Sequence, residues 1–385
     1  MKLNALIIGF GLLCFSMSVW CQMYKPKSDD EILEKLPISQ NEKLRISKTR
    51  QALTTRPDDY ELAIKLANDY IVLGRTQSDP RYYSYAEAVL ARWLQPNYPR
   101  ALLLQATVLQ NRHDFKNAAN LLKQALTRHP GFGQAWLTLA AIYEAQGNYP
   151  EALKSCLSML RNANDSLATS VCIHSALSLA GQAQSSYRQL SAINLATGSA
   201  EEIIWACTVL AELAERLGLS EEAENWYRKA LSQPFRSVYC LTSYADFLLD
   251  QKRPEDVVRL LKNETQADAL LLRLTLAEQK LQSSQVNDHI ELIQNRFSAA
   301  KQRQDKTHEG DKARFNLYLL NDAATALQLA QSNWTVQKEP RDARILLEAA
   351  IAAEQPAAAA PVVQFIEKTG LEDKRLNVLL QTAKG

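Results

Sequence analysis

Glycine is scarce in this chain, with only 12 among 385 residues, well below the usual ~7%. No stretch alternates apolar and polar residues with the period of two that a half-buried strand requires. Alanine, leucine, glutamine, glutamate, lysine and arginine dominate instead, and these residues favour helices. The composition therefore predicts an all-α protein, long enough for two or three compact domains or one extended array.

Concentrated charge of one sign is also missing. The chain has 44 basic and 42 acidic residues, a formal net charge of +2, and no basic block. Nucleic-acid binding needs positive charge clustered on one face. We therefore do not expect nucleic acid to be the partner.

Motifs for catalysis, metal binding and phosphate binding are absent as well. No two of the five histidines are four residues apart, and no cysteine pair has C-x-x-C spacing. There is no glycine-rich phosphate loop and no G-x-S-x-G elbow. We expect no catalytic residue, no metal and no cofactor, and hence no enzyme. An active site assembled from distant segments remains the alternative.

What the chain does contain is a repeat of 34 residues. Shifting the sequence by that period places Leu102 on Trp136, Ala106 on Ala140 and Ala118 on Ala152. Such a period indicates stacked helix–turn–helix units. The recurring alanines lie where two antiparallel helices would approach closely. One hairpin cannot bury its apolar face alone, so each needs the next.

The residues at these positions resemble the tetratricopeptide repeat (TPR) family. In residues 133–164 the matches are Trp136, Leu139-Ala140, Tyr143, Gly147 and Ala152. The resemblance implies a right-handed α-solenoid of TPR-type helical hairpins that binds a protein or peptide.

Three further motifs resemble those of a group of uncharacterised bacterial TPR proteins that carry signal peptides. They are Asp79-Pro80-Arg81-Tyr82, the residues Asn333-Trp334 followed by Asp342-Ala343-Arg344, and Gly370-Leu371-Glu372-Asp373. This resemblance implies no activity.

Between the first two repeats, five extra residues fall in 75–83. The tyrosines there either pack a lengthened turn or form a contact lip.

The repeat spacing and the breaks in it divide the chain into five parts. We predict a signal peptide or anchor at 1–21, a tether and helices at 22–56, a TPR-like array at 57–301, a polar loop at 302–312, and C-terminal hairpins with a capping helix at 313–385.

The first 21 residues have the pattern of a secretory signal. Lys2 precedes an apolar run over residues 5–19, and Ser16 and Ser18 have the spacing for cleavage. The run is short for a membrane span, which needs ~20 residues. An uncleaved anchor and a lipoprotein attached through Cys21 are the alternatives. Each places the remainder outside the cytoplasm, in the periplasm or secreted, or anchored to the inner membrane.

Two cysteines are expected on neighbouring helices of consecutive hairpins. A disulfide between Cys156 and Cys172 would close a loop of about 16 residues and add roughly 3 kcal/mol in an oxidising compartment. Two buried thiols are the alternative, since free cysteine packs as a small apolar residue. Cys207 and Cys240 lie on successive first helices, where a bond is disfavoured by distance.

The resemblance also implies a concave groove lined by set positions of each first helix. The first part of this groove is rich in amides, which suit hydrogen bonding to a peptide backbone, and the second part is acidic. For any one of these residues, a merely solvated side chain is the alternative. The positions are Asn68, Arg100, Thr107, Gln110, Asn111, Gln134, Glu144, Glu212, Glu215, Arg216, Tyr239, Asp246 and Asp250, with Thr138 nearby.

These observations favour a non-catalytic scaffold in the bacterial periplasm that binds a protein or peptide. The alternative is an accessory factor of an envelope assembly or export complex, anchored by its N-terminus. In that case the protein contacts the membrane only through its N-terminal segment, which stays uncleaved.

Processing of the N-terminus separates these hypotheses. We expect mass spectrometry of protein purified from its native cell to show a chain that lacks residues 1–21, because the apolar run and the small residues after it suit signal peptidase. An intact N-terminus would instead support the anchored form, and a lipid mass on Cys21 the lipoprotein.

Overall fold

The computed structural model describes residues 40–163, 166–302 and 307–384. The chain divides into two units, residues 1–39 and residues 40–385, and only the second is described here. The expectations for the signal peptide and most of the tether therefore lie outside the described residues. Within these ranges every regular element is a helix, which confirms the predicted all-α class.

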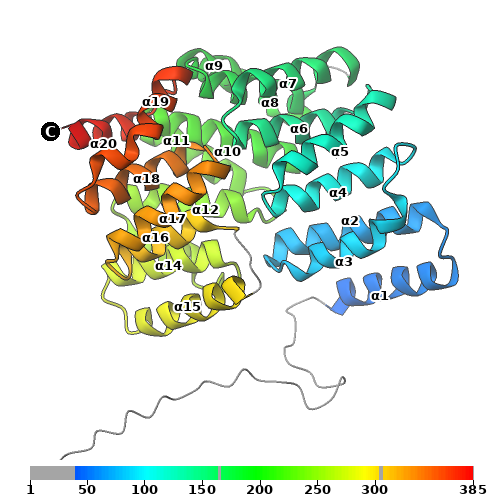
Figure 1. Ribbon diagram of the computed structural model, residues 1–385, viewed down its shortest axis with the longest axis horizontal. Helices are drawn as coiled ribbons and strands as arrows, with labels where there is room; N and C mark the ends of the chain where they lie inside the picture. The colour runs from blue at the N-terminus through cyan, green and yellow to red at the C-terminus, as the bar shows by residue number, and fades with distance from the viewer. Residues whose placement is uncertain (1–39, 164–165, 303–306, 385) are drawn as a thin grey trace, which may run out of the picture. The chain divides into compact units, whose positions relative to one another are not determined.

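Twenty α-helices and three short 3₁₀ helices make up the described part of the chain (Figure 1). The α-helices are α1 (Gln40–Thr55), α2 (Tyr60–Gln77), α3 (Arg81–Leu90), α4 (Pro99–Asn111), α5 (Phe115–Arg128), α6 (Gly133–Ala145), α7 (Tyr149–Ala163), α8 (Leu167–Leu179), α9 (Ala183–Ser191), α10 (Ala200–Leu217), α11 (Ser220–Leu231), α12 (Val238–Asp250), α13 (Pro254–Leu261), α14 (Asp268–Lys280), α15 (Val286–Gln302), α16 (Glu309–Tyr318), α17 (Ala323–Val336), α18 (Pro340–Ala352), α19 (Ala360–Thr369) and α20 (Lys374–Lys384).

The helices pair into hairpins that stack in chain order. The even-numbered helices from α2 to α18 are the first helices of these hairpins, and each contacts the next one along the row. The odd-numbered helices from α3 to α19 complete the hairpins, and α20 packs on α18. Because each hairpin rests on its neighbours, the described residues form an α-solenoid.

The repeated small residues allow these contacts. Ala106 on α4 and Ala118 on α5 have no exposed surface, and neither has Leu122 beside them. A larger side chain at either alanine would push the two helix axes apart. Trp136 and Tyr143 of the following hairpin pack on the same apolar cluster. The 34-residue pattern thus corresponds to packing within and between hairpins.

The five extra residues in the first repeat lengthen a helix and not a turn. Helix α2 has 18 residues, whereas α4 and α6 have 13 each. Tyr82 is buried, and the Tyr83 ring lies so close to Gly74 that a Cβ there would be 2.9 Å from Cζ of the ring. Most of this tyrosine cluster therefore serves packing, although Tyr85 remains 46% exposed.

The predicted loop at 302–312 is shorter than expected. Helix α15 runs to Gln302 and α16 begins at Glu309, so the last four residues of that segment are helical. Phe315 of α16 packs with Leu272 of α14 in one apolar cluster. The row of first helices therefore continues past this loop. The boundary at 301 therefore marks a loop within one continuous row of hairpins.

Each of the nine described hairpins turns through one residue with a positive φ, between 53° and 79°. Three of these residues are glycines, and all three are approached by the C-terminal part of the chain: Gly147 by Phe365, Gly181 by Gly370, and Gly218 by Lys374. The other turns use Ser78, His113, Lys252, Gln282, Asn321 and Glu354. Glycine thus occupies the turns that need a positive φ and that also lie against the C-terminal part of the chain.

Consecutive hairpins are also joined covalently. Cys156 of α7 and Cys172 of α8 form a disulfide, with their Cα atoms 5.6 Å apart. Both side chains are buried with Ala140 in a small apolar cluster. Cys207 and Cys240 are free and buried. The bridge ties the second helix of one hairpin to the first helix of the next.

Gly181 provides a test of the contact between its turn and the C-terminal segment. In Gly181→Ala the alanine must keep a φ of +79°, and its new methyl group meets the Gly370 carbonyl oxygen at 3.2 Å. We expect the free energy of unfolding to fall by roughly 1–2 kcal/mol, because an L-residue is strained there. Urea denaturation measures this change.

Gly131→Ala is the matched control. Its φ is not in the left-handed region, and the nearest atom to a new Cβ is 3.4 Å away. We expect a change within about 0.5 kcal/mol. Equal losses in the two variants would contradict the role given to Gly181.

Candidate binding surface

The first part of the predicted groove lies on α2, α4 and α6. The side chains of Asn68 and Gln134 are exposed, and Gln110 and Asn111 are half-buried. Their amide groups are therefore at least partly accessible to a ligand along this row of first helices, although the Asn111 amide already donates one hydrogen bond to the Thr107 carbonyl oxygen at 2.9 Å.

Two other predicted residues of this part are already engaged. Arg100 forms an ion pair with Glu61 of the preceding first helix at 2.8 Å. Thr107 is only 6% exposed, and its hydroxyl donates to the Leu103 carbonyl oxygen within its own helix. The prediction that Thr107 faces a ligand was wrong, because a threonine hydroxyl can bond back to the preceding helical turn.

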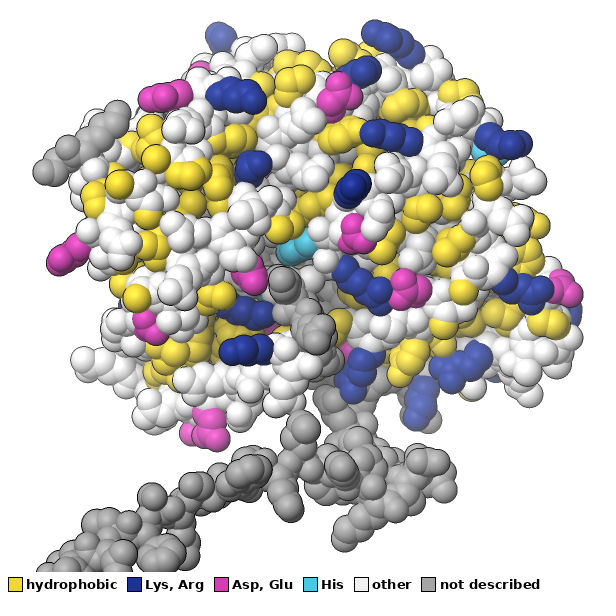
Figure 2. Space-filling view, in the orientation of Figure 1, with side chains coloured by type: hydrophobic (Ala, Val, Ile, Leu, Met, Phe, Trp, Pro, Cys, Tyr) yellow, Lys and Arg dark blue, Asp and Glu magenta, His cyan; other side chains and the backbone are white. Residues whose placement is uncertain are grey.

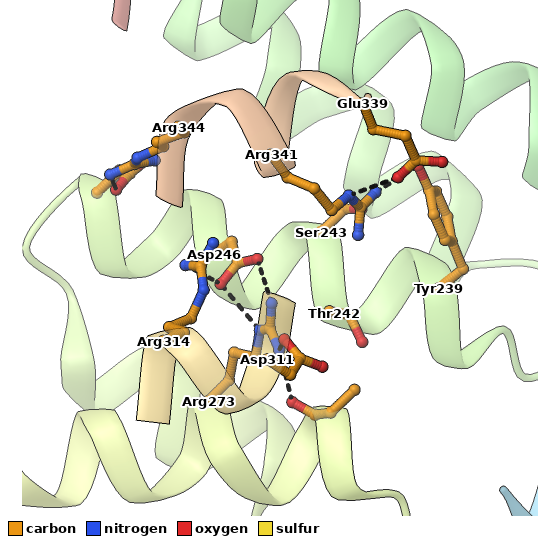
Figure 3. A network of polar contacts seen from close by, with 12 residues as sticks. Tyr239, Thr242, Ser243, Asp246, Arg273, Asp311, Arg314, Glu339, Arg341 and Arg344 are labelled. Carbon is orange, nitrogen blue, oxygen red and sulfur yellow. Dashed lines mark hydrogen bonds and ion pairs between the residues drawn. The ribbon is translucent and has the colours of Figure 1, made fainter. Parts of the chain in front are cut away.

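The second, acidic part of the groove is filled by the C-terminal hairpins. Arg341 of α18 forms an ion pair with Glu212 of α10 at 3.3 Å, and it bonds to the Tyr239 hydroxyl and stacks over that ring at 4.6 Å. In Figure 3, the guanidinium of Arg341 reaches the Glu339 carboxylate, next to the Tyr239 ring. Two predicted ligand-binding residues thus bind another segment of the same chain.

Asp250 and Glu215 have similar partners. Arg344, one helical turn after Arg341 on α18, makes two bonds to the Asp250 carboxylate at 2.5 and 2.7 Å. Arg375 of α20 bonds to Glu215 and is also held by Asp373 at 2.8 Å. Three arginines therefore hold the C-terminal hairpins against α10 and α12.

Asp246 belongs to a more deeply buried network. Its carboxylate accepts two bonds from Arg273 of α14, at 3.0 and 2.9 Å, and lies 3.4 Å from Arg314 of α16. Asp311 completes the surroundings of Arg273 (Figure 3). The nearby guanidinium groups outweigh burial and hold the pKa of Asp246 well below its usual range. Because Arg273 is only 2% exposed, this network is part of the stack.

Arg216 lies inside the molecule. It is 5% exposed, and its guanidinium donates to the carbonyl oxygen of Ser178 at 3.0 Å and to the Ser178 hydroxyl at 2.6 Å. The prediction that Arg216 faces an open groove was therefore wrong, since the neighbouring first helix α8 takes up its donors.

Glu144 connects the two parts of the groove. Its carboxylate accepts a hydrogen bond from Ser175 at 3.1 Å. Burial raises the pKa of this carboxyl from 4.5 to about 8, and the negative charges of Glu339 and Glu212 add to the effect. The Ser175 hydroxyl and Arg216 act in the opposite direction.

Sequence reasoning missed the three arginines that occupy the acidic part. Arg344 lies in one of the motifs singled out in the sequence, and Arg375 follows another by two residues. Other residues of these motifs make the same contact: Gly370 approaches Gly181, and Glu372 accepts a bond from the Ala183 N–H at 3.1 Å. The motifs thus include residues of this contact, but their spacing did not indicate partners more than 90 residues away.

One buried pair supports this arrangement from within. The Asn333 amide donates to Asp342 at 2.8 Å, and the other oxygen of that carboxylate accepts from the Glu339 N–H at 3.0 Å. Both side chains are buried. Asp342 thereby fixes the start of α18, the helix that presents Arg341 and Arg344.

Other features of the described surface are scattered charges and an open depression. On the face drawn in Figure 2, lysine and arginine side chains are scattered among apolar and uncharged ones. A shallow, open depression of about 510 Å³ lies between the start of α4 and the α5–α6 turn, lined by Arg100, Arg128 and Phe132 among others. Among the described residues no three His, Cys, Asp or Glu side chains are placed to hold a metal ion, and none of the described helices is long and apolar enough to cross a membrane.

Comparison with known proteins agrees with this geometry. Tetratricopeptide repeat family models match residues 103–166 and 206–233, which correspond to α4–α7 and α10–α11. No curated protein gives a significant match to the chain.

Several solved structures are similar over most of the chain. The APC/C hetero-tetramer Cut9-Hcn1 matches at 12% identity and a TM-score of 0.49, over 85% of this chain and 64% of that one, under two thirds of its length. A tetratricopeptide repeat protein from Parabacteroides merdae ATCC 43184 matches at 15% and 0.33, over 74% and 99%. An IFIT1 monomeric mutant with Gppp-AAAA matches at 12% and 0.39, over 89% and 76%.

The stacked hairpins with their 34-residue period define an α-solenoid repeat protein. The two matched segments coincide with hairpins of that stack. The chain therefore contains tetratricopeptide repeats, in the two segments that the family models match. Proteins with this fold are typically non-catalytic and bind other proteins.

The raised pKa of Glu144 predicts how stability depends on pH. A carboxyl that titrates near pH 4.5 when unfolded and near 8 when folded binds more protons in the folded state between these values. Its contribution to the free energy of unfolding therefore falls as the pH rises from about 5 to 8. We expect Glu144→Gln to show a shallower decline than the wild type, measured by urea denaturation at pH 5, 6.5 and 8.

Glu222→Gln is the control for this series, because Glu222 is an exposed glutamate on α11. We expect the same pH profile as in the wild type. A Glu144→Gln profile that matches the wild type would show that this carboxyl does not keep its proton on folding.

Proposed function

We propose that this protein is a non-catalytic scaffold that binds a protein partner along the first part of its concave face, formed by α2, α4 and α6. The observation that carries the proposal is the accessibility of the amide side chains of Asn68, Gln110, Asn111 and Gln134 on neighbouring first helices. Amides in such a row suit hydrogen bonding to the backbone and side chains of a peptide.

The second part of the groove supports this choice by exclusion. Glu212, Glu215, Tyr239 and Asp250 are engaged by arginines of α18 and α20. A partner that binds this form of the chain therefore has the α2–α6 part of the row available to it.

We further propose that the protein functions outside the cytoplasm, in the periplasm. The buried Cys156–Cys172 bond is typical of oxidising compartments, and the first 21 residues have the pattern of a secretory signal. Retention by an uncleaved N-terminus would place the same scaffold beside a membrane complex.

Site-specific photo-crosslinking in the native cell tests the binding surface. A photoreactive residue is placed at Asn68 or at Gln110, and for comparison at Gln124, an exposed position on the second helix α5. We expect one and the same protein to be captured from both first-helix positions and not from Gln124, because the partner contacts only the row of first helices. Mass spectrometry identifies the captured protein.

Equal capture from all three positions would indicate random collision, and no capture from Asn68 or Gln110 would reject this surface. Circular dichroism of each variant confirms that the helical stack is intact.

A further inference from the structure

The acidic face is the set of Glu212 and Glu215 on α10 and Asp250 on α12, with Tyr239 beside them. It is covered by a segment that the repeat architecture does not require there. In a solenoid each repeat needs contact only with its neighbours. Hairpins α16–α17 and α18–α19 already have theirs, through α14, α16 and α18. The contacts of α18 and α20 with α10 and α12 are additional to the stack.

These additional contacts are mostly polar. Besides the three arginine pairs, the Lys338 N–H donates to the Ala145 carbonyl oxygen at 2.8 Å, and Glu372 accepts from Ala183. The side chains of Arg341, Arg344 and Arg375 keep 23–32% of their surface exposed, whereas Arg273 in the stack keeps 2%. Water and salt therefore reach these three arginines more readily than Arg273, and their pairs are screened more strongly.

Apolar contacts are few where α18–α20 face the earlier hairpins. Leu179 packs on the C-terminal cluster, which covers residues 313–376, and Tyr149 lies 5.9 Å from Phe365. Helix α16 differs, because its Phe315 and Leu319 share a buried cluster with Leu272 of α14 and keep it on the stack. A mostly polar boundary, such as the one that α18–α20 make, is typical of parts that move relative to each other.

Helix α18 presents two different faces. Ala343, Leu346 and Ala350 are fully or almost fully buried in the C-terminal cluster, so the helix stays with its own hairpins. Arg341 and Arg344, three residues apart, point from the other face to α10 and α12 (Figure 3). The acidic face therefore accommodates a helix that carries two arginines one turn apart.

We propose that the acidic face is a binding surface for an arginine-bearing helix of a protein partner, and that α18–α20 of the same chain occupy it until that partner replaces them. The inference rests on the proposed scaffold function but concerns another part of the concave face. Because the internal helix is tethered, its effective concentration is high, on the order of millimolar. In most molecules α18–α20 cover the acidic face. An external helix therefore binds weakly, in proportion to the small fraction of molecules in which this face is uncovered.

A fluorescent peptide with the sequence of residues 338–352 is the probe. It is titrated into the full chain and into the triple variant Arg341→Ala, Arg344→Ala, Arg375→Ala, which removes the internal arginines and leaves the acidic face unchanged. We expect the triple variant to bind the probe at least tenfold more tightly than the wild type. Raising the salt concentration should weaken that binding, since exposed charge pairs are screened.

Three controls make the result specific. A peptide with glutamate in place of both arginines should not bind. Adding Glu212→Gln and Asp250→Asn to the triple variant should abolish the gain. Arg259→Ala, which removes an exposed arginine paired within its own helix, should bind as weakly as the wild type.

The outcomes separate cleanly. A triple variant with intact circular dichroism that binds no better than the wild type would show that α18–α20 are a fixed part of the fold, and equal binding of both peptides would reject recognition of arginine. If the triple variant does not fold, Arg344→Ala alone should still bind more tightly than the wild type, by a smaller factor, and no gain there overturns the proposal. Capture of a partner through Asn68 without peptide binding would reject this inference and leave the proposed function standing.

Discussion

The structure depends on one constraint: a single helical hairpin is too thin to enclose its own apolar face. Every hairpin from α2 to α19 therefore rests on its neighbours, and small residues such as Ala106 and Ala118 set how closely the helices approach. Stacking of this kind gives a row of first helices with their polar positions aligned. The groove, its amide-rich part and its acidic part all follow from that alignment.

The contacts of α18 and α20 with α10 and α12 are of a different kind from the contacts within the stack. Within the stack, neighbouring hairpins are joined by buried apolar clusters, and the Arg273–Asp246 pair is shielded from water. Between distant hairpins, partly exposed arginines meet carboxylates of α10 and α12. The same chain thus uses burial to build the array and charge to close it, and the second kind of contact responds to salt and competitors far more readily.

Much of the fold could be predicted from the sequence because repeat packing is local. Ala106 and Ala118 return one period later as Ala140 and Ala152, so the helix pairs and their stacking followed from spacing alone. A disulfide between Cys156 and Cys172 was one of two predicted states, the other being two buried thiols. It could be predicted because hairpins adjacent in sequence are adjacent in space. The site was harder to predict. Glu212 and Asp250 were correctly placed on first helices, but Arg341 and Arg344 lie 129 and 94 residues further along, and no local pattern encodes such a contact. The predictions that Thr107 and Arg216 line an open groove were wrong for a related reason. The burial of a side chain depends on its neighbours in space, which repeat spacing does not reveal.

The bridge between α7 and α8 has a consequence for how the molecule comes apart. A linear stack frays from its ends, because terminal repeats have one neighbour and inner repeats have two. A covalent tie between the third and fourth hairpins restricts the unfolded states of the segment that joins them. Fraying that starts at either terminus therefore meets added resistance there, and a protease that trims the ends would slow when it reaches the tied pair.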